Sequence, residues 1–377
     1  MAEEEQTVNI ACSAAGQPPP TITWSKAIGS LPDRATVSRS ALKINNVLRK
    51  DGGIYICKAE NIQGKAVTTA QLMIFSRLRF KVRPLAQLTA LIGYPVRLPC
   101  VAESSLKPTI AWMKDGKPLL PAESRILQNN TLVISSVKKS HEGSYTCKAT
   151  NAVSTIQANV QVTSTTPSSC SVIRKYSSSS SGNYVIDPDG EGGLVPFTVY
   201  CDISDKNGVG VTVISHDSES RTLVDGYDGH GSYSRSIHYS GAHLTQLTSL
   251  TNVSVNCEQF IKYECYGSVL WFKNSNPSGW WVSRDSSQML YWGGASPGSV
   301  KCACGMANSC ADPSEACNCD KNDGVWREDS GLLTDKSTLP VKELRFGDTG
   351  VNGPNAVADE KGYHTLGKLK CYGIAQE

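Results

Sequence analysis

One arrangement of cysteine, tryptophan and tyrosine occurs twice in residues 1–163, and it narrows the folds open to this part of the chain more than any other feature. In each copy a tryptophan follows the first cysteine by twelve residues, and a tyrosine precedes the second cysteine by two. The repeated positions are Cys12, Trp24, Tyr55 and Cys57, then Cys100, Trp112, Tyr145 and Cys147. In a two-sheet sandwich such cysteines bridge facing strands, the tryptophan packs on the bridge and the tyrosine ties a corner.

Short segments between these positions have the period of half-buried strands. Residues 131–137 (TLVISSV) alternate apolar and polar side chains between turn-forming residues, which is typical of antiparallel strands. The constellation resembles the immunoglobulin family, specifically the intermediate set found in adhesion receptors, and the resemblance covers both copies. The family's Asp-x-Gly-x-Tyr-x-Cys is intact from Asp51 to Cys57, whereas His141 replaces the aspartate in the second copy. The resemblance implies two all-β sandwiches, the second without the acidic partner of a turn-stabilising ion pair.

The domain boundaries follow from the repeat and from a change in composition. We expect four segments: immunoglobulin-like domains at residues 1–76 and 77–163, a Ser/Thr/Pro-rich linker at 164–169 and a third domain at 170–377. Eleven residues precede Cys12, which is few for the first strands of such a sandwich. We therefore expect that the sequence begins inside a domain and that a signal peptide lies upstream.

The third domain holds ten of the fourteen cysteines and is rich in Gly, Ser, Trp and Tyr. Helical periodicity is weak, with one helix expected within residues 241–255, so we expect an irregular α+β module stapled by disulfides. Converging thiolates can bind zinc, but the cysteine count is even and no CxxC redox motif occurs. We expect Cys257 and Cys265 to pair locally. The pairing of the remaining cluster stays open: Cys302, Cys304, Cys310, Cys317, Cys319 and Cys371.

Several motifs of this module, in order, carry a second resemblance. They are YVIDPDGEGGLVPFTVYCDI, VNCEQFIKYECYGS, GWWVSRDSSQMLYWGG, KCACG, CNCD and TLPVKELRFGDTG. The module is similar to the fibrinogen-like domain of contactin-associated proteins, the neurexin IV type, from about Cys170 to Cys371. This resemblance implies a Cys170–Cys201 pair and an extracellular chain whose cysteines all form disulfides. A weaker similarity, through YVIDPDGEGG and the following YCD, extends to fibrillar-collagen C-propeptides.

Charge and hydropathy exclude some functions. The charges of the 37 basic and 34 acidic residues nearly cancel. We expect the basic residues to be scattered over the surface, so neither nucleic acid nor an anionic membrane is an expected partner. No apolar run approaches the roughly 20 residues of a membrane helix.

Two motifs resemble catalytic sites without fitting them. Gly294–Gly298 matches G-x-S-x-G, but Pro297 follows Ser296 and has no N–H for an oxyanion hole. Ser215, His216 and Asp217 are consecutive, whereas the members of a catalytic triad converge from separate elements. We therefore expect no enzyme activity.

Acidic residues offer one candidate ion site. Asp187, Asp189 and Glu191 alternate along a Gly-rich turn, a spacing that presents several oxygens to calcium. The alternative is a solvated turn, while the collagen-propeptide resemblance implies calcium binding. No other cofactor is expected. A second carboxylate cluster, with loop solvation as its plainer interpretation, comprises Asp320, Asp323, Glu328 and Asp329.

Aromatic residues offer a candidate ligand surface. Trp280, Trp281, Tyr291 and Trp292 flank the polar turn SRDSSQ, and exposed aromatics mark recognition surfaces. Core packing is the alternative. Asn129 and Asn252 begin N-glycosylation sequons, which are compatible with secretion.

These observations predict a non-enzymatic, secreted or extracellular recognition and adhesion protein. Its expected partners are extracellular or cell-surface proteins, with glycans as a second class. One alternative is a secreted lectin-like fibrinogen-related protein. Another is a structural component of the extracellular matrix, including a mineral-associated one. Both modules support many partners, so the fold does not identify the ligand.

Overall fold

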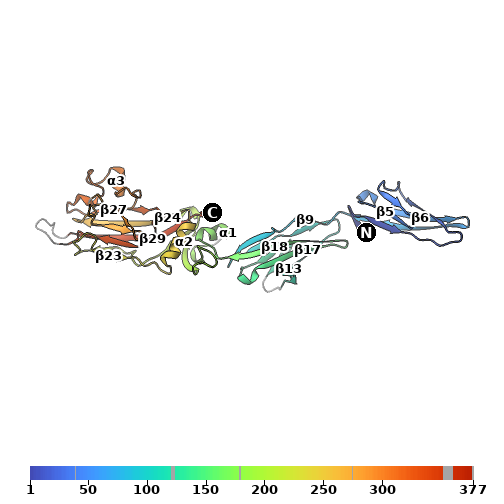
Figure 1. The fold of residues 1–377 in the computed structure, drawn as a ribbon, viewed down its shortest axis with the longest axis horizontal. Helices are drawn as coiled ribbons and strands as arrows, with labels where there is room; N and C mark the ends of the chain where they lie inside the picture. Colours follow the sequence, from blue (N-terminus) through green and yellow to red (C-terminus); the bar gives the residue numbers. More distant parts are fainter. Residues whose placement is uncertain (39, 120–123, 178–179, 274, 351–359, 376–377) are drawn as a thin grey trace. The chain divides into compact units, whose positions relative to one another are not determined.

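The computed structural model describes residues 1–377 except 39, 120–123, 178–179, 274, 351–359 and 376–377. The chain divides into two compact units, Met1–Ser164 and Thr165–Glu377 (Figure 1). The first unit is built of strands with two short 3-10 turns, and the second combines strands with three α-helices. The predicted fold class, two β-sandwiches followed by a disulfide-rich α+β module, is therefore confirmed. Within the described residues no helix is long and apolar enough to cross a membrane.

The first repeat of unit 1 is a sandwich of short strands. Its strands are β1 (Ala2–Glu3), β2 (Val8–Ala11), β3 (Thr21–Lys26), β4 (Ala35–Val37), β5 (Ala41–Ile44), β6 (Gly53–Asn61), β7 (Gly64–Leu72) and β8 (Ile74–Phe75). One sheet has the order β3-β6-β7 and the other β2-β5-β4, while β1 pairs with β8 in parallel. The residues before Cys12 thus supply two strands, β1 and β2.

The core of this sandwich forms around the cysteine bridge. Cys12 and Cys57 are disulfide-bonded with their Cα atoms 6.6 Å apart, and Trp24 and Tyr55 lie in the same buried cluster. The Tyr55 hydroxyl donates a hydrogen bond of 2.7 Å to the Asp51 carbonyl oxygen. This bond ties β6 to the 3-10 turn η1 (Arg49–Asp51) before it, as a tyrosine corner does.

The second repeat builds the same fold from a longer set of strands. These are β9 (Arg79–Val82), β10 (Gln87–Leu91), β11 (Val96–Leu98), β12 (Val101–Glu103), β13 (Thr109–Lys114), β14 (Lys117–Pro118), β15 (Arg125–Ile126), β16 (Leu132–Ile134), β17 (Gly143–Thr150) and β18 (Thr155–Thr165). The main sheet has the order β10-β18-β17-β13-β14, with β11-β16-β15 and β12-β9 as separate sheets. Its core contains the Cys100–Cys147 disulfide, Trp112 and Tyr145.

The two sandwiches differ where His141 replaces an aspartate. In the first, Asp51 Oδ2 accepts the Leu48 N–H at 2.8 Å and pairs with Arg34 at 2.6 Å. In the second, the 3-10 turn η2 (Lys139–His141) places His141 Nδ1 where it accepts the Lys138 N–H at 3.0 Å. The histidine therefore replaces the hydrogen bond to the backbone, and the fold is retained as predicted.

Unit 2 contains three α-helices, two 3-10 turns and eleven strands in its described residues. The helices are α1 (Cys170–Tyr176), α2 (Leu244–Val253) and α3 (Ala303–Ala307), and the 3-10 turns are η3 (Lys206–Gly208) and η4 (Cys319–Lys321). The strands are β19 (Gly182–Ile186), β20 (Phe197–Asp202), β21 (Val211–Ile214), β22 (Thr222–Val224), β23 (Tyr233–Ser236), β24 (Asn256–Tyr266), β25 (Trp280–Val282), β26 (Gln288–Met289), β27 (Arg327–Leu333), β28 (Glu343–Phe346) and β29 (Lys361–Tyr372). Helix α2 confirms the helix predicted within residues 241–255.

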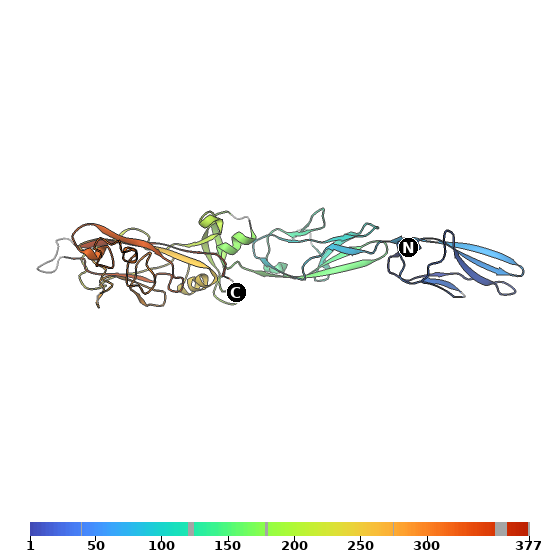
Figure 2. The same ribbon diagram turned by 90° about the horizontal axis from the view of Figure 1, so that it is seen from above.

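Two long antiparallel strands form the centre of this unit. The larger sheet has the order β19-β20-β21-β29-β24-β27, with β22 also paired to β29. In Figures 1 and 2 the yellow β24 and the red β29 run side by side. A smaller sheet has the strand order β23-β28-β25-β26. It packs on β24 and β29 through contacts between aromatic side chains. Phe346 of β28 stacks on Tyr263 of β24 with ring centroids 4.3 Å apart, and His364 of β29 stacks on Phe346 from 5.7 Å.

Candidate functional site

The acidic turn predicted as an ion site connects β19 to β20 in unit 2. Asp187 follows β19 directly, and its N–H donates to the Pro167 carbonyl at 2.9 Å. Its side chain is 6% exposed, and Oδ1 is buried without a hydrogen-bond partner among the described residues. Such a group costs free energy unless something pairs with it. The turn therefore directs an uncompensated oxygen inward.

A second carboxylate lies beside it. Burial is the largest cause that raises the pKa of Asp187. This pKa is raised further by the charge of Asp189, by a hydrogen bond with the Asp189 side chain and by the charge of Glu191. Asp189 Oδ2 accepts the Leu194 N–H at 2.7 Å. A side chain at Gly193 would overlap the Asp189 carboxylate, so glycine is required there for the turn to close around it. The structure brings Asp187 and Asp189 together and places Glu191 within electrostatic range.

The aromatic residues predicted as a ligand surface lie mainly in the core. Trp281, Tyr291 and Trp292 are at most 2% exposed. The Trp281 indole donates to the Tyr291 carbonyl at 2.8 Å, and that of Trp292 donates to the Asp329 carbonyl at 2.9 Å. Trp280 is partly buried against Gly231. An exposed recognition surface at these positions is thus wrong for three of the four, because their large apolar rings are packed in the core.

All fourteen cysteines form disulfides in the structure. The pairs are Cys12–Cys57, Cys100–Cys147, Cys170–Cys201, Cys257–Cys371, Cys265–Cys319, Cys302–Cys317 and Cys304–Cys310. The Cys170–Cys201 pair agrees with the fibrinogen-like resemblance. Sulfurs of Cys302 and Cys317 lie within 4.8 Å of an Asp329 oxygen, but they are bonded to each other and do not offer two free thiolates to a metal.

The predicted local pair of Cys257 with Cys265 is wrong. Both residues lie on the continuous strand β24, where eight residues span about 26 Å at 3.3 Å per residue. Cys257 instead faces Cys371 across the β24–β29 pairing, and Cys265 bonds to Cys319 of η4. The extended conformation between the two cysteines excludes their direct bond.

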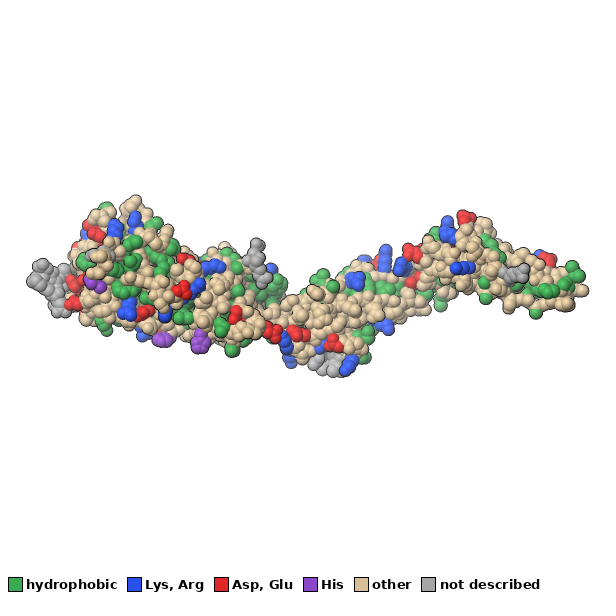
Figure 3. All heavy atoms as spheres, viewed as in Figure 1, with side chains coloured by type: hydrophobic (Ala, Val, Ile, Leu, Met, Phe, Trp, Pro, Cys, Tyr) green, Lys and Arg blue, Asp and Glu red, His purple; other side chains and the backbone are tan. Residues whose placement is uncertain are grey.

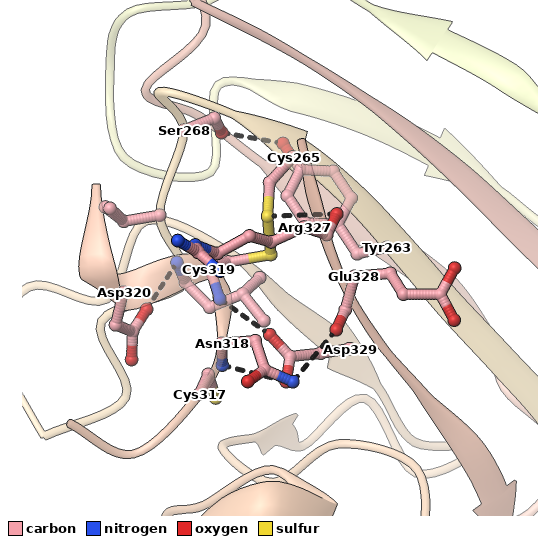
Figure 4. Close-up of a disulfide and its surroundings, with 12 residues drawn as sticks. Tyr263, Cys265, Ser268, Cys317, Asn318, Cys319, Asp320, Arg327, Glu328 and Asp329 are labelled. Carbon is pink, nitrogen blue, oxygen red and sulfur yellow. Dashed lines mark hydrogen bonds between the residues drawn. A yellow bond between two sulfur atoms is a disulfide. The ribbon is translucent and has the colours of Figure 1, made fainter. Parts of the chain in front are cut away.

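The second carboxylate cluster divides into two buried groups, Asp320 and Asp329, and two exposed groups, Asp323 and Glu328. Figure 4 shows Asp320 and Asp329 beside Cys319, with Glu328 pointing away from Asp329. Asp329 Oδ1 accepts the Asn318 N–H at 3.0 Å and Oδ2 accepts the Cys319 N–H at 2.9 Å. Asp320 Oδ1 accepts the N–H groups of residues 270 and 271 at 3.0 and 2.9 Å. Burial raises the pKa of both aspartates to about 6. Asp329 thus connects β27 to residues 318 and 319. Asp320 connects the residue after Cys319 to residues 270 and 271.

The exposed members of this cluster form ordinary ion pairs. Asp323 pairs with Arg327 at 2.5 Å and with Lys321 at 3.4 Å. Glu328 lies 3.6 Å from the Lys262 ammonium group. The four carboxylates therefore do not converge on one ion, which agrees with the plainer interpretation of a loop stabilised by charge.

In the two motifs that resemble catalytic sites, the structure shows contacts with the backbone and no assembled triad among the described residues. His216 Nδ1 accepts the Ser218 N–H at 3.1 Å, and its Nε2 lies 2.9 Å from the Gly367 carbonyl, so backbone groups occupy both ring nitrogens. Ser296 is exposed in a turn, where its carbonyl accepts the Ser299 N–H. Asn129 and Asn252 are both exposed, as glycosylation requires.

The basic residues are not all scattered, contrary to the expectation from the sequence, because four of them lie close together. Arg77, Arg79, Lys81 and Arg83 alternate with apolar residues at the start of the second sandwich, and all four are exposed. The alternation R-x-R-x-K-x-R is visible in the sequence, but it is hidden when charges are only counted. The four side chains are exposed within seven consecutive residues, so together they form one cationic segment of the surface.

Comparison with known proteins identifies the two sandwiches. Residues 1–74 match the immunoglobulin I-set domain, and residues 80–151 match the immunoglobulin domain. Neurexin-4 of Drosophila melanogaster is 43% identical over 197 residues, which are 51% of this chain and 15% of that protein. Contactin-associated protein 1 of Mus musculus is 42% identical over 206 residues, 54% of this chain and 14% of that protein.

Among solved structures, extracellular domains 3–5 of Drosophila OTK match with 30% identity and a TM-score of 0.39, over 43% of this chain and 58% of that chain. The chain spans about 15% of the length of the curated relatives it matches. The matched positions, the disulfides and the tyrosine corners together show that residues 1–74 and 80–151 are immunoglobulin domains, in a chain that is partly similar to neurexin-4 and contactin-associated protein 1.

Proposed function

We propose that this chain acts outside the cell as a non-enzymatic recognition and adhesion protein. The observation that carries the proposal is the complete pairing of its cysteines in seven disulfides around two immunoglobulin domains. Such disulfides persist in oxidising, extracellular environments. Partial similarity to neurexin-4 and contactin-associated protein 1 supports the same location.

We assign the parts of the chain as follows. Immunoglobulin domains at residues 1–76 and 77–163 form the arm, residues 164–169 the linker, and residues 170–377 a fibrinogen-like module that contacts a partner. The boundary between the two compact units, at Ser164, supports this division. The similarity to contactin-associated protein 1 supports the identity of the last module. The proposed glycosylation sites are Asn129 in the second immunoglobulin domain and Asn252 in the last module.

Proteins are the favoured partners of this module. Sugar binding by stacking needs exposed aromatic faces, and three of the four aromatic residues expected to form a ligand surface, Trp281, Tyr291 and Trp292, are in the core. Protein binding rests instead on a few side chains that become buried in the complex. The test is binding of the secreted full chain to intact cells before and after trypsin treatment of their surface. Binding that trypsin abolishes supports the proposal, and binding that survives complete removal of surface proteins contradicts it.

Calcium is the proposed ligand of the acidic turn. Asp187 and Asp189 supply carboxylate oxygens of the kind that calcium prefers, and the unpaired Asp187 Oδ1 fits an ion because nothing else among the described residues satisfies it. Glu191 is close enough to contribute charge. A bound ion would hold the turn between β19 and β20 by pairing with these oxygens.

Calcium is expected to stabilise the wild type, and the Asp187→Asn substitution is expected to stabilise the fold when calcium is absent. At a calcium concentration of about 100 times the dissociation constant, the wild type gains about 2.7 kcal/mol of unfolding free energy. In EDTA at neutral pH, Asp187→Asn is expected to be more stable than the wild type. The raised pKa of Asp187 means that its buried carboxylate destabilises the fold when charged. Thermal unfolding followed by tryptophan fluorescence measures both effects.

The matched control for this experiment is Asp285→Asn, because the Asp285 side chain is 73% exposed. That variant is expected to keep the calcium response of the wild type. Equal melting temperatures of the wild type in calcium and in EDTA would rule out the calcium site.

A further inference from the structure

The segment 77–83 (RLRFKVR) presents its four charged side chains to solvent, and of its apolar residues Val82 is also exposed. Arg77, Arg79, Lys81 and Arg83 are exposed, whereas Leu78 is 2% exposed and Phe80 packs against the core of the second immunoglobulin domain. Alternate residues of an extended chain are about 6.6 Å apart. Arg79 and Lys81 lie on β9, and the pairing of β9 with β12 shifts register beside Lys81. The four cations, here called the cationic ladder, therefore form an exposed basic segment up to about 20 Å long in and beside β9.

Hydrogen bonds hold the backbone of the ladder in place. β9 pairs with β12, with Arg79 opposite Glu103. Ser76 before it donates its N–H to Ser105 Oγ at 2.7 Å and accepts from Ser104 Oγ at 2.7 Å. The Leu78 N–H donates to Glu3 Oε1 at 3.3 Å. The ladder is thus ordered without a ligand, which lowers the entropy cost of binding.

The charges of the ladder are only partly neutralised. Arg77 pairs with Glu5 at 2.8 Å and Arg79 with Glu103 at 2.8 Å. Each partner is exposed, and exposed ion pairs contribute about 1 kcal/mol or less, so a ligand can replace them. Neither Lys81 nor Arg83 has an acidic partner in the described part of the chain. Two cations are therefore free and two are exchangeable.

The ladder borders a hollow rather than a flat surface. A cavity of about 780 Å³ is lined by Arg77, Arg79 and Arg83, together with three glutamates, Glu4, Glu5 and Glu103. In Figure 3, Lys and Arg side chains gather beside acidic ones over the part of the chain that Figure 1 labels β9. A narrow chain can lie in such a hollow along the row of cations. A flat bilayer cannot follow such a concave surface. The three glutamates repel any anion, so a polyanionic chain must lie on the side of the hollow that carries the arginines.

We propose that the cationic ladder binds a linear sulfated polysaccharide. The ligand must be a polyanion long enough to contact several of these cations, and the seven disulfides place the chain where sulfated polysaccharides, rather than nucleic acids, are the abundant linear polyanions. The inference goes beyond the proposed protein recognition by unit 2 and shares with it only the extracellular location. It assigns a second, independent attachment point to the immunoglobulin arm.

The test measures binding of the secreted full chain to immobilised heparin at increasing salt concentration. Lys81→Ala combined with Arg83→Ala is expected to lower the affinity about fivefold to tenfold at low salt, because two unpaired cations are lost. Glu5→Gln combined with Glu103→Gln is expected to raise the affinity by about twofold to fivefold, since it frees Arg77 and Arg79. A merely structural role of the ladder predicts no such increase.

The matched control removes two cations elsewhere. Lys43 and Lys65 are exposed in the first immunoglobulin domain, and Lys43→Ala combined with Lys65→Ala is expected to bind heparin like the wild type. Equal losses in both double variants would reduce the effect to net charge and overturn the proposal. Binding to vesicles of phosphatidylserine without binding to heparin would also overturn it. The protein binding of unit 2 is expected to survive in every variant, so the two proposals fail separately.

Discussion

Removing the Cys265–Cys319 disulfide is expected to cost about 4 kcal/mol of unfolding free energy. The bond closes a segment of 54 residues between β24 and η4, and freeing so long a segment raises the entropy of the unfolded chain. Both cysteines are 2% exposed, so alanine is the appropriate replacement because it adds no buried hydroxyl. Denaturant unfolding of the secreted Cys265→Ala plus Cys319→Ala variant measures the loss.

The control for this prediction is the disulfide with the shortest loop. Cys304 and Cys310 are six residues apart in sequence, and the same entropy argument gives a cost of about 2 kcal/mol for replacing both with alanine. The two losses are expected to differ by a factor of about two. Losses of the same size, or a larger loss for the shorter loop, would show that loop closure is not what this disulfide contributes.

Asp329→Asn is expected to lower the unfolding free energy by about 2–4 kcal/mol. Each of its two carboxylate oxygens accepts a backbone N–H, from Asn318 and from Cys319, in a buried setting. An asparagine keeps one acceptor and turns its amide group toward the other N–H. The segment that carries Cys319 loses one of its anchors, and two donors then face each other. Chemical denaturation of the secreted variant measures this loss.

Asp320→Asn is the matched control, and its expected result is the reverse. Both backbone hydrogen bonds of Asp320 end on Oδ1, so an asparagine oxygen keeps them and the buried charge is removed. We expect unchanged or higher stability at neutral pH. A large loss in Asp320→Asn, or none in Asp329→Asn, would contradict the assignment of these bonds.

The pH dependence of the same pair follows from the pKa values. Burial raises the pKa of Asp320 to about 6, above the usual value near 3.9 for an unfolded chain. The folded state therefore binds more protons than the unfolded state between about pH 4 and 6, and stability from this group falls as the pH rises through that range. The fall is expected to be smaller in Asp320→Asn. The Asp329 charge also raises the pKa of Asp320, so the difference between variant and wild type reports Asp320 together with its interaction with Asp329.

The contacts of Cys12, Trp24 and Cys57 were predictable because their constellation occurs twice and resembles a known family, although the two cysteines are 45 residues apart. Helix α2 was predictable for a different reason, because it is a local structure within the segment expected to be helical. The partners of Cys257 and Cys265 were not predictable, because they depend on the pairing of β24 with segments more than fifty residues away.

The candidate sites divide in the same way. Asp187 and Asp189 are two residues apart in one turn, so their proximity follows from the sequence. Burial of Trp281 and Trp292 depends on how the smaller sheet packs on the larger, and residue type does not distinguish an exposed indole from a buried one. The carboxylates of residues 320–329 are also close in sequence, yet the chain direction at η4 and β27 turns two inward and two outward.

The most direct test of the central claim is binding of the secreted full chain to a panel of extracellular and cell-surface proteins, with a glycan array measured in parallel in calcium and in EDTA. The account predicts saturable binding to at least one protein, retained in Lys81→Ala plus Arg83→Ala. Calcium-dependent binding to glycans, with no protein bound in either condition, would contradict it and make the chain a lectin.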